Sequence, residues 1–145
     1  MANPVCNVFL TKERLELPRE DVDLAAGAIV DFWGVVRSLE DDREIEGIEY
    51  EVHWVMAQHQ LEKVAQQAAF DFKLGLVVIH HRVGFVRAGE ASLLVRVASR
   101  HRAEAFRANH WIVDELKQRA PIWKQPRFKT KNQRRASHSE AATAK

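Results

Sequence analysis

Two amphipathic segments enclose a pair of apolar strands, and this arrangement most restricts the folds open to the chain. Apolar residues recur at helical spacing over residues 55–72 and again over residues 102–120. Between them, residues 74–83 and 91–98 are apolar and β-branched, and a Gly-containing turn over residues 84–90 joins them as an antiparallel pair. Helices beside hairpin-linked strands predict an α+β fold, with both helices packed on one side of a mostly antiparallel sheet.

Shorter elements complete a predicted order of β-α-β-β-α-β-β-α-β. Strands are expected at residues 5–10, 28–37 and 48–54, a short helix at residues 22–26, and an extended segment at residues 122–124. Gly34 interrupts the second strand, which indicates a bulge or a close backbone approach. Residues 38–46 are polar and acidic, so a mobile loop is expected there. Met56 and Phe106 are expected on the apolar faces of the two long helices.

The composition is that of one ordinary globular domain. The chain has 145 residues, of which 46% are hydrophobic and 29% charged. No apolar run approaches the roughly 20 residues of a membrane span, and the first residues lack the layout of a signal peptide. One cysteine, Cys6, excludes an internal disulfide and a multi-cysteine metal site, and we expect it to be a small buried residue of the first strand. A reducing cytoplasm and no membrane contact are therefore expected.

Charge divides the chain into an acidic body and a basic end. From Lys117 onward there are nine Lys and Arg residues against one acid, Glu140, whereas residues 1–116 carry 13 basic and 19 acidic side chains. We predict a folded domain over residues 1–125 and a disordered basic tail over residues 126–145. Binding of nucleic acid or an acidic protein by this tail is an alternative to a simply solvated segment.

Lys117 and Lys124 are the first candidates for chemistry. Lys117 falls in the last turn of the second long helix, and Pro121 turns the chain before Lys124. Both ammonium groups can then face one pocket, where neighbouring cations lower each other's proton affinity and prepare a lysine for acid–base work. The alternative is that Lys117 only complements the helix dipole.

A second set of cations surrounds the start of the same helix. Ser99 is expected to be the N-cap, which places His101 and Arg102 in the first turn, where the helix dipole disfavours positive charge. Free N–H groups together with His and Arg make an anion site, and Arg37 can add a bidentate guanidinium. A solvated basic turn is the alternative.

No metal or cofactor site is indicated. His80 and His81 are adjacent on a predicted strand and point to opposite faces, so they cannot bind one ion together. No cluster at metal-ligand spacing, Gly-rich phosphate loop or nucleophile-elbow motif occurs elsewhere.

The chain resembles the large, catalytic subunits of molybdopterin synthase, the MoaE family. The strongest matching pieces are HRVGFVRAGE from His81, SRHRAEAF from Ser99 and LKQRAPIWK from Leu116, and FWGVVR and YEVHWVMA are weaker ones. They occur in the right order over residues 28–124, which makes the resemblance specific.

The resemblance implies a sulfur-transfer enzyme of molybdenum cofactor biosynthesis, with an α/β-hammerhead-type fold and an added small β subdomain. Such enzymes convert cyclic pyranopterin monophosphate to the dithiolene molybdopterin and need no bound cofactor. The sulfur comes from the thiocarboxylated C-terminal glycine of a small ubiquitin-like subunit. Similar proteins form a central homodimer with a small subunit at each end, a heterotetramer. A non-catalytic paralogue that still binds the small subunit is the alternative.

The resemblance also assigns roles to the candidate residues. The family's two essential lysines fall on Lys117 and Lys124, and its substrate-anion pocket falls on Arg37, His101 and Arg102. Relatives carry an ordered segment after the second lysine that can bring a basic residue into the partner protomer's pocket. Here that region begins Gln-Pro-Arg and has no tryptophan, so its candidates are Arg127 and Arg134.

Overall fold

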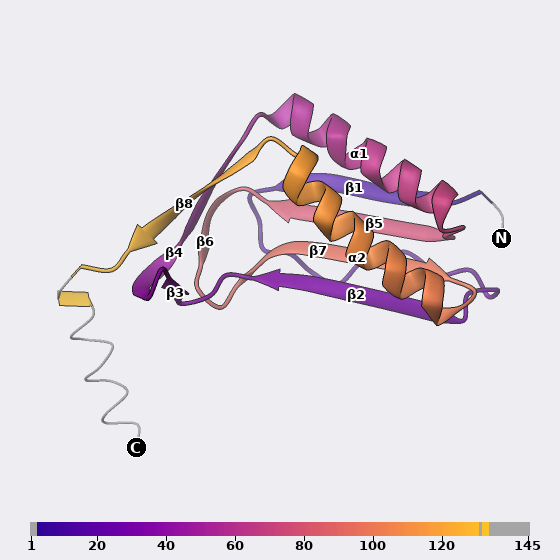
Figure 1. The fold of residues 1–145 in the computed structure, drawn as a ribbon, viewed down its shortest axis with the longest axis horizontal. Coiled ribbons are helices and arrows are strands. Elements are labelled where there is room, and N and C mark those ends of the chain that lie inside the picture. The colour runs from indigo at the N-terminus through magenta and orange to yellow at the C-terminus, as the bar shows by residue number, and fades with distance from the viewer. Residues whose placement is uncertain (1–2, 131, 134–145) are drawn as a thin grey trace, which may run out of the picture.

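Two helices lie side by side over one face of a four-stranded sheet in the computed structural model, which describes residues 3–130 and 132–133 (Figure 1). The α+β class is confirmed, and both long helices agree with their predicted bounds to within one residue at each end. The elements in chain order are β1 (Val5–Thr11), β2 (Ala28–Val35), β3 (Leu39–Glu40), β4 (Arg43–Val52), α1 (Trp54–Asp71), β5 (Leu76–Arg82), β6 (Gly84–Arg87), β7 (Ala91–Ser99), α2 (Arg102–Arg119) and β8 (Ile122–Phe128).

The main sheet has the order β1-β5-β7-β2. Its β5–β7 and β7–β2 pairs are antiparallel, as predicted, and β1 pairs with β5 in parallel. Successive residues of β5 point to opposite faces, so Val77 and Ile79 pack under the helices while Leu76 and Val78 face away. The register shifts between Gly34 and Val35, which confirms the predicted bulge at the end of β2.

The helices hold the sheet through small buried residues and one buried amide. α1 buries Ala57, Leu61 and Val64, and the sequence prediction was wrong for Met56 and Phe106, which are 55% and 60% exposed. On α2, Asn109 is 4% exposed and its Nδ2 donates to the carbonyl oxygens of Val30 at 3.0 Å and Val95 at 2.9 Å. This amide ties α2 to both β2 and β7, which fixes the position of the helix on the sheet.

The helix predicted at residues 22–26 does not form. The chain makes only a single turn there, in which Asp23 accepts a hydrogen bond from the Ala25 backbone N–H at 2.7 Å. Val22 and Ala26 instead pack against the sheet on the face opposite the helices. A single helical turn would leave most of the backbone groups of this segment unpaired. Packing on the open face of the sheet stabilises the segment more than such a turn would.

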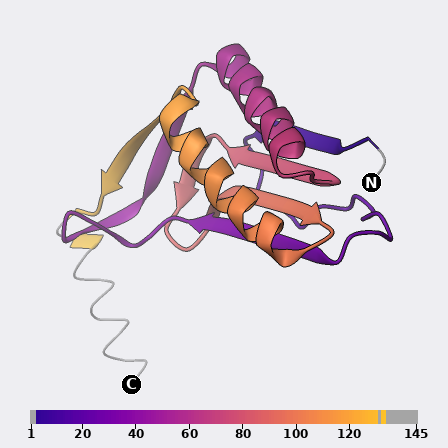
Figure 2. The ribbon, with the colours of Figure 1, turned by 45° about the vertical axis from the view of Figure 1, so that its right-hand side comes forward.

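A second, smaller sheet extends away from the ends of the helices (Figure 2). Its strand order is β3-β4-β6, and β8 pairs with the other edge of β4. The mobile loop predicted at residues 38–46 was wrong, because β3 and the start of β4 form a hairpin there. Its turn uses Asp41 and Asp42, at φ values of 50° and 60°, and short acidic side chains tolerate this left-handed region.

Two further boundaries differ from the predictions. The turn predicted at residues 84–90 contains strand β6, which pairs with β4 rather than continuing the β5–β7 hairpin. The extended segment predicted at residues 122–124 continues as β8 to Phe128, past the domain end expected at residue 125. Most of the predicted disordered tail, including Lys131, Arg134 and Arg135, lies outside the described residues.

The exposure of Cys6 differs from its prediction. Cys6 is exposed on β1, so its predicted burial was wrong, because this strand lies at the edge of the main sheet. Among the described residues, neither helix is long and apolar enough to span a membrane.

Candidate active site

A cavity of about 470 Å³ lies where the two sheets meet the C-terminal end of α2. It takes side chains from β2, β4, β5, β7, α2 and β8, which are brought together only by the folded chain. Its volume is in the usual range for small-molecule sites. The apolar residues of its wall include Val36, Ile48, Leu93, Val113, Leu116 and Ile122.

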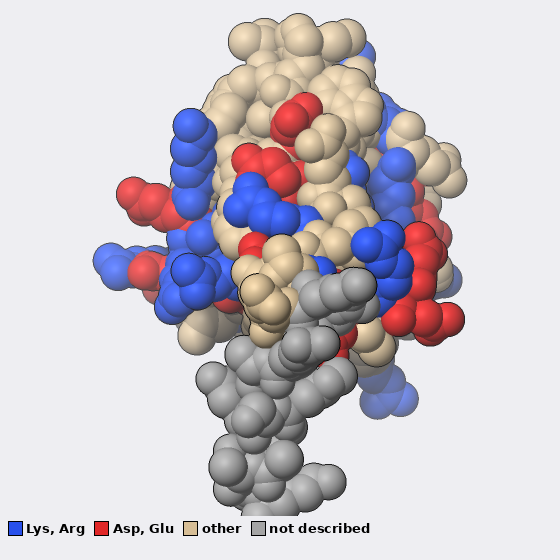
Figure 3. Space-filling view, turned by 90° about the vertical axis from the view of Figure 1, so that its left-hand side faces the viewer, with Lys and Arg blue, Asp and Glu red and all other residues tan. Residues whose placement is uncertain are grey.

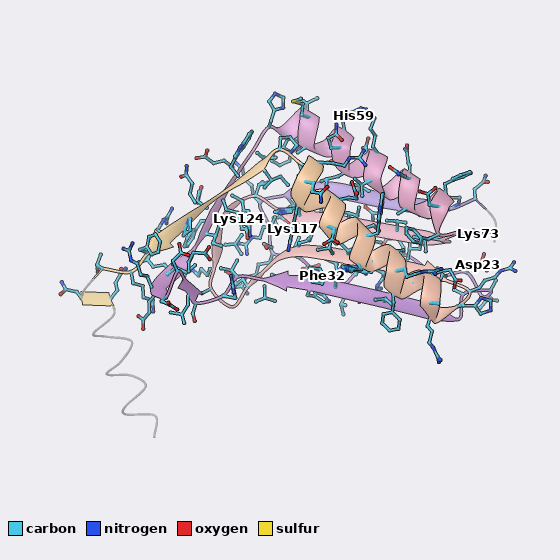
Figure 4. All side chains as sticks on the ribbon, viewed as in Figure 1. Asp23, Phe32, His59, Lys73, Lys117 and Lys124 are labelled. Carbon is cyan, nitrogen blue, oxygen red and sulfur yellow. The ribbon has the colours of Figure 1, made fainter. Side chains whose placement is uncertain are left out.

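Both candidate lysines line this cavity. Lys117 lies in the last turn of α2, and Lys124 lies near the start of β8 (Figure 4). The helix ends at Arg119, and Pro121 then accepts a hydrogen bond from the His53 N–H at 3.3 Å. This turn directs β8 back along β4, with Lys124 opposite Tyr50 in the register. The predicted convergence of the two lysines on one pocket is therefore present in the structure.

Arg37 is the third cation of the cavity. It follows the bulge that ends β2, lines the cavity and is an exposed residue. Within the described part of the chain, Arg37, Lys117 and Lys124 make no ion pair with a carboxylate. Three positive side chains without internal partners favour binding of an anionic ligand.

Polar groups form part of the cavity wall between these cations. Tyr50 is 5% exposed, and its hydroxyl donates to Ser92 Oγ at 3.1 Å. The Ser92 hydroxyl in turn donates to the Gly34 carbonyl oxygen at 3.4 Å. Burial raises the pKa of Tyr50, so its hydroxyl stays protonated at neutral pH. Glu40, from the β3 hairpin, is the acidic residue of the lining.

His81 also lines the cavity, and its ring packs edge-on against Tyr50 with centroids 5.3 Å apart. Its pKa is lowered to about 4, mainly by burial, with the Arg82 backbone hydrogen bond opposing the shift and the charge of Lys124 assisting it. The imidazole is therefore neutral at pH 7. His80 points to the opposite face of the sheet, as the strand alternation predicts. Its ring stacks on that of Phe9 with the two ring centroids 3.7 Å apart.

His101 and Arg102 do not reach the cavity. They lie at the first turn of α2, 15 residues before Lys117, which corresponds to roughly 22 Å along a helix. His101, not Ser99, is the N-cap, because the Ser99 hydroxyl donates to the His101 carbonyl oxygen and cannot cap the helix. Both side chains are exposed, and neither has a hydrogen bond or ion pair with another described residue.

The outer end of the second sheet carries mixed charge. Arg127 pairs with Glu49 at 3.5 Å and lies over the Phe85 ring at 4.1 Å, while Arg43 lies over the ring of Phe128 at 3.9 Å. Lys and Arg residues alternate with Asp and Glu on this face, without a continuous basic surface (Figure 3). Arg127 is thus held within its own chain, and Arg134 lies outside the described residues.

Sequence reasoning identified the cations of the cavity but missed its polar wall. Tyr50 was predicted only as part of a half-buried strand, and His81 was considered only as a metal ligand. Neither Glu40 nor Ser92 was singled out. Their common feature is long-range pairing between strands, which residue spacing does not reveal. Among the described residues, no group of three or more His, Cys, Asp or Glu side chains could hold a metal ion.

A family model described as MoaE protein matches residues 10–119, about three quarters of the chain. The chain is 41% identical over 100 residues to the molybdopterin synthase catalytic subunit of Pyrococcus abyssi, covering 69% of this chain and 68% of that one. It is 39% identical over 102 residues to that of Oryza sativa subsp. indica, covering 70% of this chain. The match spans 53% of the rice protein, about half its length.

Solved structures give the same likeness in three dimensions. The molybdopterin synthase of Staphylococcus aureus superimposes with a TM-score of 0.79 at 26% identity, covering 83% of this chain and 90% of that one. A complex of subunits 1 and 2 of molybdopterin-converting factor from Helicobacter pylori gives a TM-score of 0.61 at 20% identity. It covers 87% of this chain and 90% of that one, and this second likeness is one of fold.

Proposed function

The chain belongs to the MoaE family, and from that premise we propose that it is the catalytic subunit of a molybdopterin synthase. In this reaction, sulfur passes from the thiocarboxylated C-terminus of a small ubiquitin-like subunit to cyclic pyranopterin monophosphate. The product carries the dithiolene of molybdopterin. The enzyme thus acts in molybdenum cofactor biosynthesis, and a cytoplasmic location remains the prediction from the sequence.

The observation that carries this proposal is the meeting of Arg37, Lys117 and Lys124 in one cavity. Both proposed reactants are anionic, one through its cyclic phosphate and the other through its thiocarboxylate. Cations fixed on a folded scaffold bind such groups without reorganising during the reaction. The relatives named above are catalytic subunits, which favours catalysis over a non-catalytic paralogue that only binds the small subunit.

The two lysines are proposed to divide the chemistry. Each sulfur transfer forms a C–S bond at the pterin and breaks the acyl C–S bond of the thiocarboxylate. Water restores the carboxylate of the small subunit, the displaced pterin oxygen leaves as water, and two such transfers make one dithiolene. Protons must be given and taken at the reacting atoms in each transfer. We assign Lys117 to the thiocarboxylate tail and to proton transfer, and Lys124 to activation of the pterin substrate.

A small partner subunit is part of the proposal. A protein named as a catalytic subunit implies at least one other subunit, and the H. pylori structure of the same fold is a complex of two. The tail of the small subunit would enter the cavity beside Lys117. We propose that the charged residues at the outer end of the second sheet do not contact the thiocarboxylate.

A second copy of the chain is proposed to complete the site. His101 and Arg102 cannot join Lys117 within one chain, because α2 is a continuous helix between them. In a homodimer, the first turn of α2 from one protomer can face the cavity of the other and supply the phosphate site. Two small subunits on this dimer would give the heterotetramer expected from the family.

The direct test is incubation of the purified protein with thiocarboxylated small subunit and cyclic pyranopterin monophosphate. We expect the dithiolene product, detected by mass spectrometry, together with small subunit that has lost its sulfur. Binding of the small subunit without any product would support a non-catalytic carrier-binding protein instead. Deleting residues 126–145 tests nucleic-acid binding, which would then show a salt-dependent affinity that the shortened chain lacks.

A further inference from the structure

We propose that His81 is a substrate-recognition residue, whose Nε2 accepts a hydrogen bond from an N–H or O–H donor of the ligand in the cavity. The proposal rests on the proposed function in one respect, namely that this ligand is the pterin substrate. The pterin ring offers such donors, whereas the cyclic phosphate and the thiocarboxylate offer only acceptors.

The protonation of the His81 ring follows from one hydrogen bond. Nδ1 lies 2.7 Å from the backbone carbonyl oxygen of Arg82. A carbonyl oxygen can only accept, so Nδ1 must carry the hydrogen. In a neutral imidazole the other nitrogen then has a free lone pair, which makes Nε2 an acceptor.

Neutrality of the ring follows from its surroundings. His81 is 9% exposed and packs against Tyr50 from β4, and the charged residues that line the same cavity are Arg37, Glu40, Lys117 and Lys124. Burial is the main cause that lowers the pKa of His81, the hydrogen bond with Arg82 opposes this shift, and the charge of Lys124 adds to it. His81 therefore presents a neutral acceptor at physiological pH.

His81 belongs to the lining of the cavity, and its Nε2 has no hydrogen-bond partner among the described residues. The neighbouring His80 makes the contrast, because its Nε2 is fully enclosed and unpaired on the other face of the sheet. The Nε2 atom of His81 is not enclosed in this way, and its side chain is part of the cavity wall. A ligand donor that forms a hydrogen bond with such an unpaired acceptor makes the free energy of binding more favourable.

The chemistry of the lining also calls for such a group. Arg37, Lys117 and Lys124 are donors only, so they can hold an anion but cannot accept from a pterin N–H. The carboxylate of Glu40 can accept, but its charge repels a phosphate held nearby. A neutral imidazole accepts without that repulsion, and loss of its contact would leave the pterin ring without this orienting bond.

Two substitutions separate recognition from a structural role. In His81→Asn the amide can still donate to the Arg82 carbonyl oxygen but nothing replaces Nε2, whereas in His81→Gln the longer side chain brings an acceptor near the Nε2 position. We expect His81→Asn to raise the KM for cyclic pyranopterin monophosphate about tenfold. The KM of His81→Gln should stay close to that of the unchanged protein. The KM for the small subunit should be unchanged in both variants.

The opposite order would overturn the proposal. If the bond to Arg82 were all that mattered, His81→Asn would behave like the unchanged protein and His81→Gln would be defective. His80→Gln is the matched control, a buried histidine on the same strand whose replacement should leave the KM for the pterin unchanged. Failure of the unchanged protein to form product would instead count against the proposed function.

A measurement without substitution covers the case in which a variant fails to fold. Nitrogen-15 NMR of the histidine-labelled protein should report His81 with the hydrogen on Nδ1. Adding cyclic pyranopterin monophosphate alone should shift the His81 Nε2 resonance as it accepts a hydrogen bond, while His80 stays unchanged. Saturating binding of the pterin with no change at His81 Nε2 would contradict the proposal.

Discussion

The two ends of α2 carry the same kind of charge in opposite surroundings. At its C-terminal end, Lys117 lines a cavity that it shares with Lys124, Arg37 and the buried His81. At its N-terminal end, Arg102 is exposed, beside a first turn that the helix dipole makes unfavourable for cations. One end is built into a pocket within the chain, and the other is left open.

Cations that act in one binding site can come from two different protomers. α2 is one continuous helix from Arg102 to Arg119, so its two ends stay a helix length apart within the chain. A stable fold that keeps positive charge at a helix start, against the dipole, indicates a role outside its own stability. We infer that the open end serves the cavity of a second copy.

Removing the cavity cations should have the largest effect on activity. We expect Lys117→Ala and Lys124→Ala each to lower sulfur transfer by at least about 100-fold, because each removes a charge or a proton-transfer group that acts on the reacting atoms. Product formation is measured by mass spectrometry, and folding is checked by circular dichroism. Both side chains are exposed enough for the fold to be kept.

Lys63→Ala is the matched control for these variants, since Lys63 is an exposed lysine on α1 far along the chain from the cavity. It should keep full activity. Normal turnover in both cavity variants would mean that neither lysine takes part in the reaction.

The two histidines of β5 are buried, whereas His101 at the start of α2 is exposed. Their burial should make the free energy of unfolding depend on pH. The pKa of His80 and of His81 is lowered from 6.5 to about 4, mainly by burial. Between these values the unfolded chain binds protons that the folded chain does not, so the free energy of unfolding falls as the pH falls. From pH 7.5 to pH 5 each histidine should contribute a loss of about 2 kcal/mol.

Urea unfolding at these two pH values measures the loss. His80→Gln should reduce the pH dependence by the share of one histidine. An unfolding free energy that stays constant from pH 7.5 to pH 5 would show that the histidines of β5 are not held neutral.

The open end of α2 should give the smallest effect. Arg102→Ala should raise the KM for cyclic pyranopterin monophosphate about tenfold with less change in kcat, because it removes a phosphate contact rather than a reacting group. Arg107→Ala is the control, since Arg107 is exposed on the same helix and lies 3.8 Å from its own Glu104. Equal effects of the two substitutions would remove any special role for the helix start.

The sequence was sufficient to predict the helices and the lysine pair, since both depend on local pattern. Helical periodicity located α1 and α2, and the proline after Lys117 indicated that the chain turns before Lys124. The hairpin at Asp41 and Asp42 was missed because its acidic composition is typical of loops, although short acidic residues also suit left-handed turns.

The rest of the site depends on pairing between distant strands. Tyr50 and Ser92 are 42 residues apart, and their hydrogen bond exists only because β4 and β7 meet at the cavity. His101 and Arg102 were predicted to share the pocket with Arg37, but residue spacing cannot show that a continuous helix separates them. Long-range geometry of this kind follows from packing, not from local pattern.

The most direct test of the central claim uses mixed dimers, in which one chain carries Lys117→Ala and the other Arg102→Ala. Two different affinity tags allow dimers with one chain of each kind to be isolated. If each cavity takes Arg102 from the partner, one of the two sites in a mixed dimer is intact. With the pterin held well below its KM, where Arg102→Ala alone is about tenfold less active, we then expect about half the activity of the unchanged dimer. If mixed dimers are no more active than the mean of the two single-variant dimers, Arg102 does not act in the cavity of a second copy. That result would contradict the proposal that two protomers share each site.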